Sequence, residues 1–372
     1  MSTAAPRPLR VVMSPDSLTG SATAVEAADA LRRGWIHARP GDHVVVAPMA
    51  DGGQGTLDVL AAAVPGARRV PVRVTGPDDR PVDAHWLLLP DGTAVVEVAS
   101  TSGITLLDPL RPLAAHTRGF GQAIRAALDA GVTRLLLALG GSSSTDGGVG
   151  ALRELGARFA RADGSPADDD GGGALTSIAS VDLSGMRALP AGGARILGDV
   201  RAPLTGPGGA AAVYGPQKGA TPTRILALDA GLAHLGGLLG VDPAIAGAGA
   251  AGGTAAGLLA WGAVGGSGSA GVADAIGLAA LIADADVVIT GEGRFDAQSR
   301  TGKVASRVLD LARAHATAAI LVAGAVDAPT DGFAAVRSLT DLAGSAEAAR
   351  ADAVTWLERA AEDVARGGEW MG

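Results

Sequence analysis

The chain contains no cysteine, which excludes a disulfide framework, thiolate catalysis and a zinc site built on cysteine sulfur. It also has no charge-free run of about 20 large apolar residues, the length that a membrane-spanning helix requires. The first residues, MSTAAPRPLR, hold no apolar segment of the kind that directs export. We therefore expect a cytoplasmic protein that does not act at a membrane.

Lysine is nearly absent as well, occurring only at 218 and 303, so almost every basic residue is an arginine. The formal charge of −8 at pH 7 argues against nucleic acid as a partner, because phosphate backbones are bound by clustered basic residues. Small molecules are the expected partners. Because a planar guanidinium cannot replace a compact ammonium everywhere, Lys218 and Lys303 are candidates for ligand contacts.

Short apolar runs rich in β-branched residues alternate with alanine-rich helical patterns along most of the 372 residues. This alternation is typical of βαβ units around a parallel sheet. The first helix has the clearest start, since Thr23 and Glu26 have the spacing of a capping box. The expected strands are 9–14, 43–48, 134–139, 194–198, 286–290 and 319–323.

Residues 68–98 depart from this pattern, because apolar and polar residues alternate there around the turn sequences Gly-Pro-Asp-Asp and Pro-Asp-Gly. Antiparallel hairpins are the expected structure. The α/β pattern returns near residue 285, which predicts a chain of two α/β domains. We expect a discontinuous parallel-sheet domain of residues 1–67 and 285–372, with a mixed α/β domain of residues 68–284 inserted into it.

Standard nucleotide-binding motifs are missing or weak. The nearest approach to a P-loop, SRTGKVAS, lacks the upstream glycine and the Ser or Thr that follows the lysine. Two G-x-G-x-x-G matches, beginning at Gly247 and Gly266, follow no credible strand and do not support a dinucleotide site. They fall in the glycine- and alanine-rich tracts 245–257 and 262–271, whose composition predicts mobile connections.

Four segments each combine a strand, a turn with polar residues and a helix. The richest, LLLALGGSSSTDGGVGAL, has the glycines, hydroxyls and helix start that suit a phosphate group. The others begin at Leu9, Met49 and Val287 and carry carboxylates, which can hold Mg²⁺ or accept a hydroxyl proton. Each could be a solvated loop when taken alone, but their repetition in one chain favours a site at the carboxyl edge of a sheet.

Seven sequence blocks carry a family resemblance: PDSLTGSATAVEAADAL, ADGGQGT, EVASTSGITLL, GGSSSTDGGVG, GDVRAPLTGPGGAAAVYGPQKGAT, GAAGGTAAGL and ITGEGRFDAQSRTGK. In this order they resemble the motif blocks of the class I bacterial glycerate kinases, over roughly residues 9 to 327. The resemblance implies a two-domain glycerate kinase I-like fold, with a flavodoxin-like parallel-sheet domain and the active site in the cleft between domains. It implies transfer of a phosphoryl group from ATP to D-glycerate, with Mg²⁺ as the metal and 2-phosphoglycerate as the product, and it leaves a homodimer open.

The chemistry of these blocks and the resemblance together suggest roles for individual residues. Those expected to line the transfer site are Asp16, Asp51, Asp199, Glu292, Arg294 and Asp296. Of these, Asp199 and Glu292 are the expected metal ligands, and Arg294 suits the glycerate carboxylate through its bidentate fork. The residues expected at the phosphates of ATP are Gly140, Gly141, Ser142, Ser143, Asp146, Lys218 and Lys303.

Several motif positions differ from the family pattern and rearrange the charge of the expected site. Leu18-Thr19 stands for Phe-Lys, Gln54 for Glu, Thr145 for Asn and Arg201-Ala202 for Asp-Asn. One hypothesis is compensation, in which Arg201 supplies the cation that the first loop lacks. The other is divergence, either to another small hydroxy acid or to a non-catalytic pseudo-kinase that binds ligand without turnover.

Overall fold

The computed structural model describes residues 7–299 and 302–371, which form two compact units. The first unit comprises Met1–Asp51, Asp58–Pro65 and Ser269–Gly372, and the second comprises Gly52–Leu57 and Gly66–Gly268. The second unit thus ends at Gly268, whereas the domain proposed from the sequence extends to residue 284.

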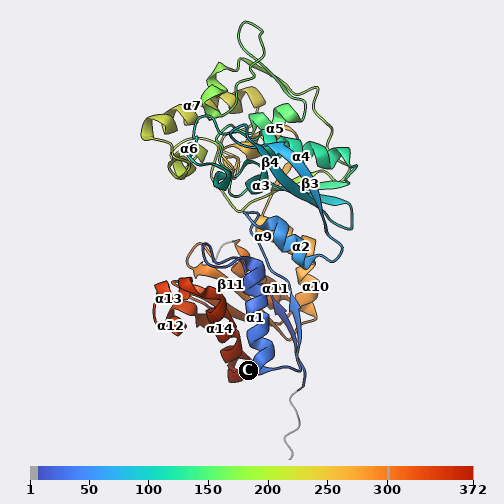
Figure 1. Cartoon of the computed structure of the whole chain (residues 1–372), viewed down its shortest axis with the longest axis vertical. Coiled ribbons are helices and arrows are strands. Elements are labelled where there is room, and N and C mark those ends of the chain that lie inside the picture. Colours follow the sequence, from blue (N-terminus) through green and yellow to red (C-terminus); the bar gives the residue numbers. More distant parts are fainter. Residues whose placement is uncertain (1–6, 300–301, 372) are drawn as a thin grey trace, which may run out of the picture. The chain divides into compact units, whose positions relative to one another are not determined.

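The first unit contains a five-stranded parallel sheet in the order β13-β12-β11-β1-β2. Of these strands, β11 is labelled in Figure 1. Its strands are β1 (Arg10–Met13), β2 (His43–Val46), β11 (Val287–Phe295), β12 (Ala318–Val326) and β13 (Ala335–Ser338). Counted within this unit, the order is the 2-1-3-4-5 of flavodoxin-like folds. The predicted flavodoxin-like sheet is confirmed. In such sheets ligands bind at the carboxyl ends of the strands where the order reverses, here between β1 and β11.

Helices cover both faces of this sheet. Ile320 and Val322 of β12 pack in one apolar cluster with α1 (Ala24–Ala38) and α14 (Ala353–Gly367). Leu321 packs with Ala305 of α11 (Val304–Ala314) instead. Alternate strand residues point to opposite faces, which explains the two clusters. The other helices that lie wholly or largely in this unit are α2 (Thr56–Ala63), α9 (Gly268–Ile276), α10 (Leu278–Ala283), α12 (Leu339–Ala343) and α13 (Ala346–Ala351).

The start of α1 follows the sequence prediction. Glu26 N donates to Thr23 Oγ1 at 3.2 Å, and Thr23 N donates to the Glu26 carboxylate at 2.9 Å. A cap of this kind contributes on the order of 1 kcal/mol. It fixes the point where the loop after β1 ends and the helix begins.

The second unit contains a six-stranded mixed sheet in the order β10-β9-β6-β5-β4-β3. Its strands β3 and β4 lie side by side in Figure 1. Antiparallel pairing joins β3 (Arg68–Thr75), β4 (Pro81–Leu88) and β5 (Thr93–Glu97), as predicted for residues 68–98. Parallel pairing joins β5 to β6 (Arg134–Ala138), β9 (Ala194–Leu197) and β10 (Val264–Gly266). The predicted mixed α/β domain is confirmed, and each of the six strands expected from apolar runs is present.

A separate two-stranded sheet, β7 (Arg158–Ala160) and β8 (Ser180–Asp182), also belongs to the second unit. The helices of this unit are α3 (Val98–Ser102), α4 (Arg118–Asp129), α5 (Val149–Glu154), α6 (Ala210–Tyr214), α7 (Pro222–Leu239) and α8 (Thr254–Ala260). Its short 3-10 helices are η1 (Ile104–Leu106), η2 (Gly172–Ser177) and η3 (Pro216–Lys218), and η4 (Glu369–Met371) ends the first unit.

The prediction of a mobile connection at 245–257 is wrong. Ala248, Ala250 and Ala256 are buried in the core of the second unit, and α8 begins within the tract. Gly252 has φ of +65°, and a Cβ there would lie 2.1 Å from the carbonyl oxygen of Ser144. The small residues therefore permit close approach of two backbone segments rather than looseness. The tract 262–271 contains β10 and the start of α9.

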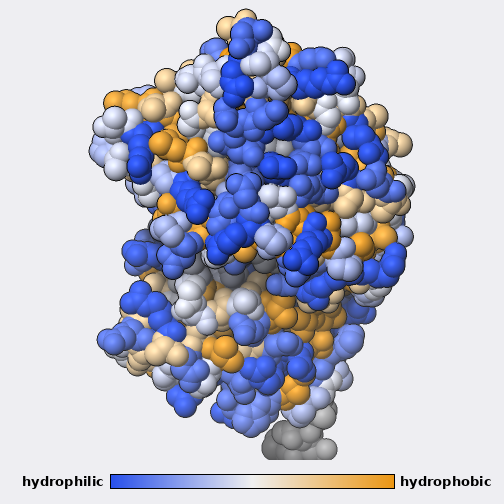
Figure 2. Space-filling model, turned by 45° about the horizontal axis from the view of Figure 1, so that its top comes forward, coloured by the Kyte–Doolittle hydropathy of each residue, from blue (hydrophilic) through white to orange (hydrophobic). Residues whose placement is uncertain are grey.

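Hydrophilic side chains and smaller apolar patches are interspersed on the face shown in Figure 2. The large apolar side chains with the greatest exposure, Leu226 at 73% and Val264 at 61%, belong to different elements, α7 and β10. Over the described part of the chain, no helix has both the length and the apolar character needed to cross a bilayer.

Candidate active site

Three of the predicted carboxylates lie at the carboxyl ends of strands in the first unit. Asp16 follows β1, Asp51 follows β2, and Glu292 lies in the last part of β11. Asp16 N donates to the carbonyl oxygen of Gly291 at 2.8 Å, which extends the pairing of β1 with β11 beyond the strand. Asp16 and Glu292 are thereby placed at the switch point of the sheet.

The pKa values of two of these carboxyl groups are raised. Burial raises the pKa of Asp16 to about 7, and the charges of Asp51 and then Glu292 add to this effect. Burial also raises the pKa of Glu292 to about 7, and its neighbours Asp296 and Asp51 contribute. Acids whose pKa values are this close to neutral can accept a proton from a hydroxyl group and release it again.

Glu292 has an oxygen that lacks a partner. Its side chain is 9% exposed, and Oε2 accepts a hydrogen bond from Ser299 Oγ at 2.9 Å. Within the described residues, Oε1 is buried without a hydrogen-bond partner. The positive charge of Lys303, the N-cap of α11, acts on the same carboxyl group and lowers its pKa. A ligand that offers a cation or a proton donor would satisfy Oε1.

Carboxylate oxygens are the donors that Mg²⁺ takes from proteins, usually one or two of them beside waters and phosphate oxygens. Oε1 of Glu292 and the neighbouring acids Asp16 and Asp51 are donors of this kind, and a cation would relieve their mutual repulsion. The residues of this cluster therefore fit a magnesium ion.

The remaining predicted residues of this segment have local partners. Arg294 is 68% exposed and its Nε lies 2.7 Å from Oδ2 of Asp327, the residue that follows β12. Asp296 Oδ1 accepts from Gln298 N at 2.8 Å, which folds the loop after β11 into a turn. Arg300 and Thr301 lie outside the described residues.

In the second unit, the glycine-serine loop of residues 140–148 follows β6 and contacts the ADGGQGT block. Gly140 N donates to the carbonyl oxygen of Gly52 at 3.0 Å. A Cβ at Gly140 would lie only 2.3 Å from Cα of Gly53, so no larger residue fits there. Gly141 has φ of +78° and is exposed. Two motifs that are far apart in the sequence are thus joined by backbone contacts between glycines.

Several polar groups of this loop point into the protein. Ser143 Oγ donates to the carbonyl oxygen of Ser102 at 2.8 Å. The Asp146 carboxylate is fully buried and accepts from Thr117 N at 2.9 Å and from Thr117 Oγ1 at 2.7 Å. It also accepts from Gly148 N at 3.2 Å and Gly150 N at 3.3 Å. These bonds fix the loop's conformation, and Gly140, Gly141 and Ser142 form its most accessible part.

Lys218, from η3, lies beneath the same loop. Its side chain is 3% exposed, and Nζ donates to Ser142 Oγ at 3.0 Å and to the carbonyl oxygen of Ser144 at 2.5 Å. Burial lowers the pKa of Lys218 to about 8, although the charge of Asp146 opposes this effect. The ammonium group is therefore largely protonated at neutral pH.

The ends of β9 and β5, which flank β6 in the mixed sheet, carry acidic residues that bind helix N-termini. Asp199 follows β9, and its Oδ1 accepts from Gly268 N, the first residue of α9, at 3.0 Å. Glu97, the last residue of β5, accepts from Gly55 N at 2.7 Å and from Thr56 N at 3.1 Å. Glu97 was not predicted as a site residue, although an acid at a strand end inside the EVASTSGITLL block is the signal that also selected Asp16.

The motif positions that depart from the family pattern differ in their surroundings. Thr19, Gln54 and Arg201 are exposed, whereas Thr145 is 1% exposed. Leu18 is buried and pairs with Ala22 within the first loop. The changes in charge therefore affect surface positions, and the buried changes keep uncharged residues.

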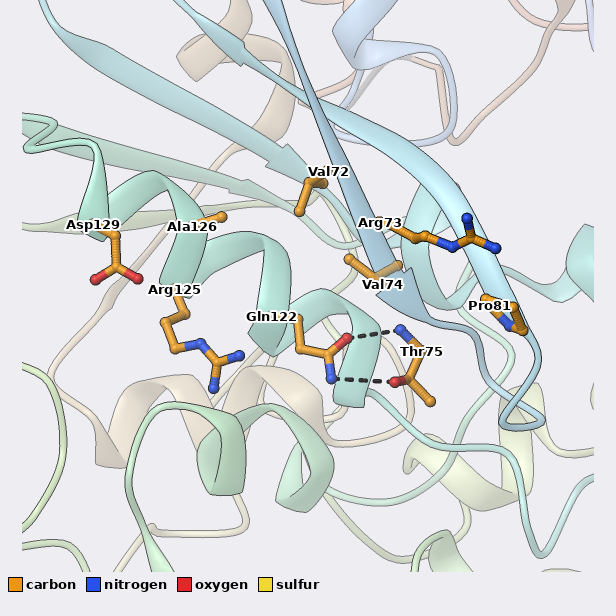
Figure 3. A pocket seen from close by; sticks show the side chains of 9 residues that line it. All are labelled: Val72, Arg73, Val74, Thr75, Pro81, Gln122, Arg125, Ala126 and Asp129. Atoms are coloured by element: carbon orange, nitrogen blue, oxygen red, sulfur yellow. Dashed lines mark hydrogen bonds between the residues drawn. The ribbon is translucent and has the colours of Figure 1, made fainter.

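A pocket of about 490 Å³ lies elsewhere in the second unit, between β3 and α4 (Figure 3). Gln122 spans it to the edge strand, accepting from Thr75 N at 2.7 Å and donating to Thr75 Oγ1 at 3.2 Å. Arg125, which also lines it, lies 3.0 Å from Glu154 Oε2. None of the predicted site residues is in its lining, so the pocket is not the candidate active site.

A second group has the spacing of metal ligands, but an arginine already lies beside its carboxylates. Asp79, His116 and Asp170 each place one ligand atom within 4.8 Å of the others. Within the group, His116 Nε2 lies 3.4 Å from Oδ1 of Asp79, and Arg118 N donates to His116 Nδ1 at 3.4 Å. The Arg118 guanidinium also lies 3.5 Å from Asp170 and 3.8 Å from Asp79. A cation is already present, and we assign no metal to this group.

Comparison with known proteins identifies the family. The family model described as "Glycerate kinase family" matches residues 11–368. The glycerate kinase of Bacillus subtilis (strain 168) is 39% identical over 374 residues, which cover 96% of this chain and 97% of that protein. The glycerate 2-kinase of Escherichia coli (strain K12) is 39% identical over 328 residues, 86% of each chain.

A solved structure has the same fold. The crystal structure assigned to glycerate kinase 2 of Salmonella typhimurium LT2 superimposes with a TM-score of 0.84 at 38% identity, covering 97% of this chain and 98% of that chain. The match extends over the parallel sheet of the first unit and the mixed sheet of the second. From its sequence and from its fold, this chain belongs to the glycerate kinase family of phosphotransferases.

Proposed function

We propose that this enzyme uses ATP to phosphorylate D-glycerate and releases 2-phosphoglycerate and ADP. The observation that carries the proposal is the position of Asp16 and Glu292, two carboxyl groups with raised pKa values at the switch point of a flavodoxin-like sheet. A phosphoryl transfer to an alcohol needs a group that orients the hydroxyl and takes its proton. Carboxyl groups tuned close to neutral pH suit this task.

On the acceptor side, we assign the proton to Asp16. The glycerate hydroxyl oxygen forms a bond to the γ-phosphorus, its proton passes to the Asp16 carboxylate, and the bond from the γ-phosphorus to the bridging oxygen breaks to release ADP. Asp51 keeps the pKa of Asp16 high through its negative charge. Arg294, at the end of β11, is proposed to bind the glycerate carboxylate. To do so, its guanidinium would leave the ion pair with Asp327.

Glu292, with Oε1 buried and unpartnered, is the protein ligand that we propose for Mg²⁺. Asp199 is proposed as a second ligand from the sequence, and Asp296 stays a proposed site residue near Glu292. When bound, the ion would supply positive charge to the phosphate oxygens during transfer. Lys303 at the start of α11 would supply charge of the same sign.

On the nucleotide side, Gly140, Gly141 and Ser142 are proposed to contact phosphate oxygens, because the two glycines are the accessible part of the loop after β6 and Ser142, 7% exposed, directly follows them. Ser143 and Asp146 support this role from within by fixing the loop. Their buried hydrogen bonds favour a supporting role over direct phosphate contact.

The alternative functions have less support. A non-catalytic protein would have no need to keep two carboxyl groups of raised pKa, Asp16 and Glu292, at the switch point. The substitutions that prompted the alternative lie at exposed Thr19, Gln54 and Arg201. No described feature favours a different hydroxy acid as the acceptor.

The test is a kinase assay with the purified full chain, Mg²⁺-ATP and a panel of small hydroxy acids that includes D-glycerate, L-glycerate and lactate. We expect ADP to form fastest with D-glycerate, and ³¹P NMR to place the phosphate on the 2-hydroxyl. Asp16→Asn should reduce kcat by a factor of about 10² or more. Absence of ADP with D-glycerate, or faster turnover of another acid, would overturn the proposal.

A further inference from the structure

The lysine beneath the glycine-serine loop supports an inference that rests on the proposed function and makes it more specific. The described hydrogen-bond partners of the Lys218 ammonium are both uncharged oxygens, Ser142 Oγ at 3.0 Å and the Ser144 carbonyl at 2.5 Å. The side chain is 3% exposed, so the ammonium lies under the loop and not on its surface.

A buried ammonium is unfavourable for folding alone. Its removal from water costs free energy that two neutral hydrogen bonds do not fully restore. The negative charge of buried Asp146 offsets part of this cost, yet burial still lowers the pKa of Lys218 to about 8. A methionine or leucine would fill the same space without that cost. The charge itself therefore has a use, and the loop above it has the glycines and hydroxyls that suit an anion.

Ser142 connects this charge to the accessible part of the loop. A serine hydroxyl has one hydrogen to donate and two lone pairs to accept with. Because Ser142 Oγ accepts from the Lys218 ammonium, its own hydrogen must point elsewhere. Ser142 is 7% exposed and directly follows the exposed Gly141, so the outward direction is toward the loop surface.

We propose that Lys218 is a positioning residue that acts through Ser142. It holds the Ser142 hydroxyl as a hydrogen-bond donor to a phosphate oxygen of ATP, and it contributes positive charge beneath the loop without touching the nucleotide. Gly140 and Gly141 allow the phosphate to approach closely. The proposal differs from direct contact, since Lys218 and Ser142 then form one functional unit.

The first test measures the binding of Mg²⁺-ATP to the full chain by calorimetry in the absence of glycerate. The variants are Ser142→Ala, Lys218→Met and the double variant, with Ser177→Ala as the control, because exposed Ser177 bonds only within its own 3-10 turn. Each single variant should weaken binding about tenfold or more, which is the effect of one charge-assisted hydrogen bond. The double variant should bind no more weakly than Lys218→Met alone.

The second test uses pH. Wild-type affinity for ATP should fall as the pH rises through about 8, where Lys218 loses its proton, and Ser142→Ala should show a much smaller fall. Lys218→Arg should bind ATP more weakly than the wild type, because a planar guanidinium does not match a site built for a compact ammonium. A residue that only filled space would give no loss of affinity with rising pH.

Two results would overturn the inference. One is a loss of ATP affinity in the double variant equal to the product of the losses in the two single variants. The other is a wild-type ATP affinity that does not change between pH 7 and 9. If Lys218→Met does not fold, the wild-type pH profile and Ser142→Ala decide the question alone. Failure of the proposed function looks different, because the wild type would then produce no ADP from D-glycerate whatever these binding results show.

Discussion

Asp16 and Glu292 each lie three residues beyond the paired residues Met13 and Ile289, on two neighbouring parallel strands. The backbone bond from Asp16 N to the carbonyl oxygen of Gly291 holds this register past the end of β1. Two acids that are 276 residues apart in the sequence are thus placed by strand pairing alone. Their raised pKa values follow from that placement and from burial, and they can be tested through stability.

Asp16→Asn should stabilise the protein at pH 8 and not at pH 4. Because the folded-state pKa of Asp16 is raised to about 7, the folded protein binds more protons than the unfolded chain between about pH 4 and pH 7. Stability from this group is complete below its unfolded pKa and is lost as the pH rises through 7. The substitution removes that loss, for a gain of at most about 4 kcal/mol at pH 8. Thermal unfolding at both pH values measures it.

Asp42→Asn is the matched control, because the pKa of Asp42 is lowered whereas that of Asp16 is raised. Asp42 accepts from Leu9 N at 3.0 Å and from Trp35 Nε1 at 2.9 Å. Burial alone would raise the pKa of Asp42, but these donors and Arg39 outweigh it, so the pKa is lowered. Its contribution is present above the ordinary pKa and is lost as the pH falls through the lowered value. Asp42→Asn should therefore destabilise at pH 8. Equal effects of the two substitutions would contradict the assignment.

Ser299→Ala should move the acid limb of the pH–rate profile to higher pH. Ser299 Oγ donates to Glu292 Oε2 at 2.9 Å, and this bond favours the charged carboxylate. Without it the pKa of Glu292 rises further, so a higher pH is needed to ionise the group. The measurement is kcat/KM for glycerate from pH 5 to 9. A limb that stays in place would show that ionisation of Glu292 does not limit the reaction.

Glu97→Ala should destabilise the second unit by about 2–3 kcal/mol. The buried carboxylate accepts from Gly55 N and Thr56 N, so its loss leaves two backbone donors without their partner. Glu97→Gln retains an acceptor oxygen and should recover part of the loss. Urea unfolding measures both, with exposed Glu347→Ala as a control expected to stay within about 0.5 kcal/mol. A loss in Glu97→Ala no larger than in the control would show that the two donors find water instead.

Sequence patterns were sufficient to predict the strands that carry the candidate site and the start of the first helix. Apolar runs of β-branched residues predicted each strand that ends at a site loop, and Thr23 with Glu26 predicted where α1 begins. The carboxyl ends of parallel strands share one edge of a sheet, so the positions of Asp16, Asp51 and Glu292 followed from strand order. These predictions succeed because they depend on periodicity and local capping.

The directions of individual side chains could not be predicted in the same way. Asp146 and Ser142 are neighbours in one polar loop, yet Asp146 points inward to four donors and Ser142 lies beside the accessible glycines. Only tertiary packing decides this, through Thr117 and Lys218, which lie far away in the sequence. The prediction of a mobile connection at 245–257 is wrong for a related reason. Glycine and alanine are typical both of flexible linkers and of segments whose backbones pack closely together.

Gly140→Ala should lower both stability and kcat/KM, whereas Gly237→Ala should raise stability. A Cβ at Gly140 would lie 2.3 Å from Cα of Gly53, so the 140–148 loop and the ADGGQGT block must separate. We expect a loss of about 1–3 kcal/mol, as in other overpacked sites, and a loss of ATP affinity as the loop shifts. Gly237 is the control, because it lies in α7 with open space around its Cβ direction, where alanine favours the helix by about 1 kcal/mol. Urea unfolding and steady-state kinetics separate the two effects. If Gly140→Ala retains both wild-type stability and wild-type ATP affinity, contact between the two glycine motifs does not hold the 140–148 loop in the shape that we propose for phosphate binding.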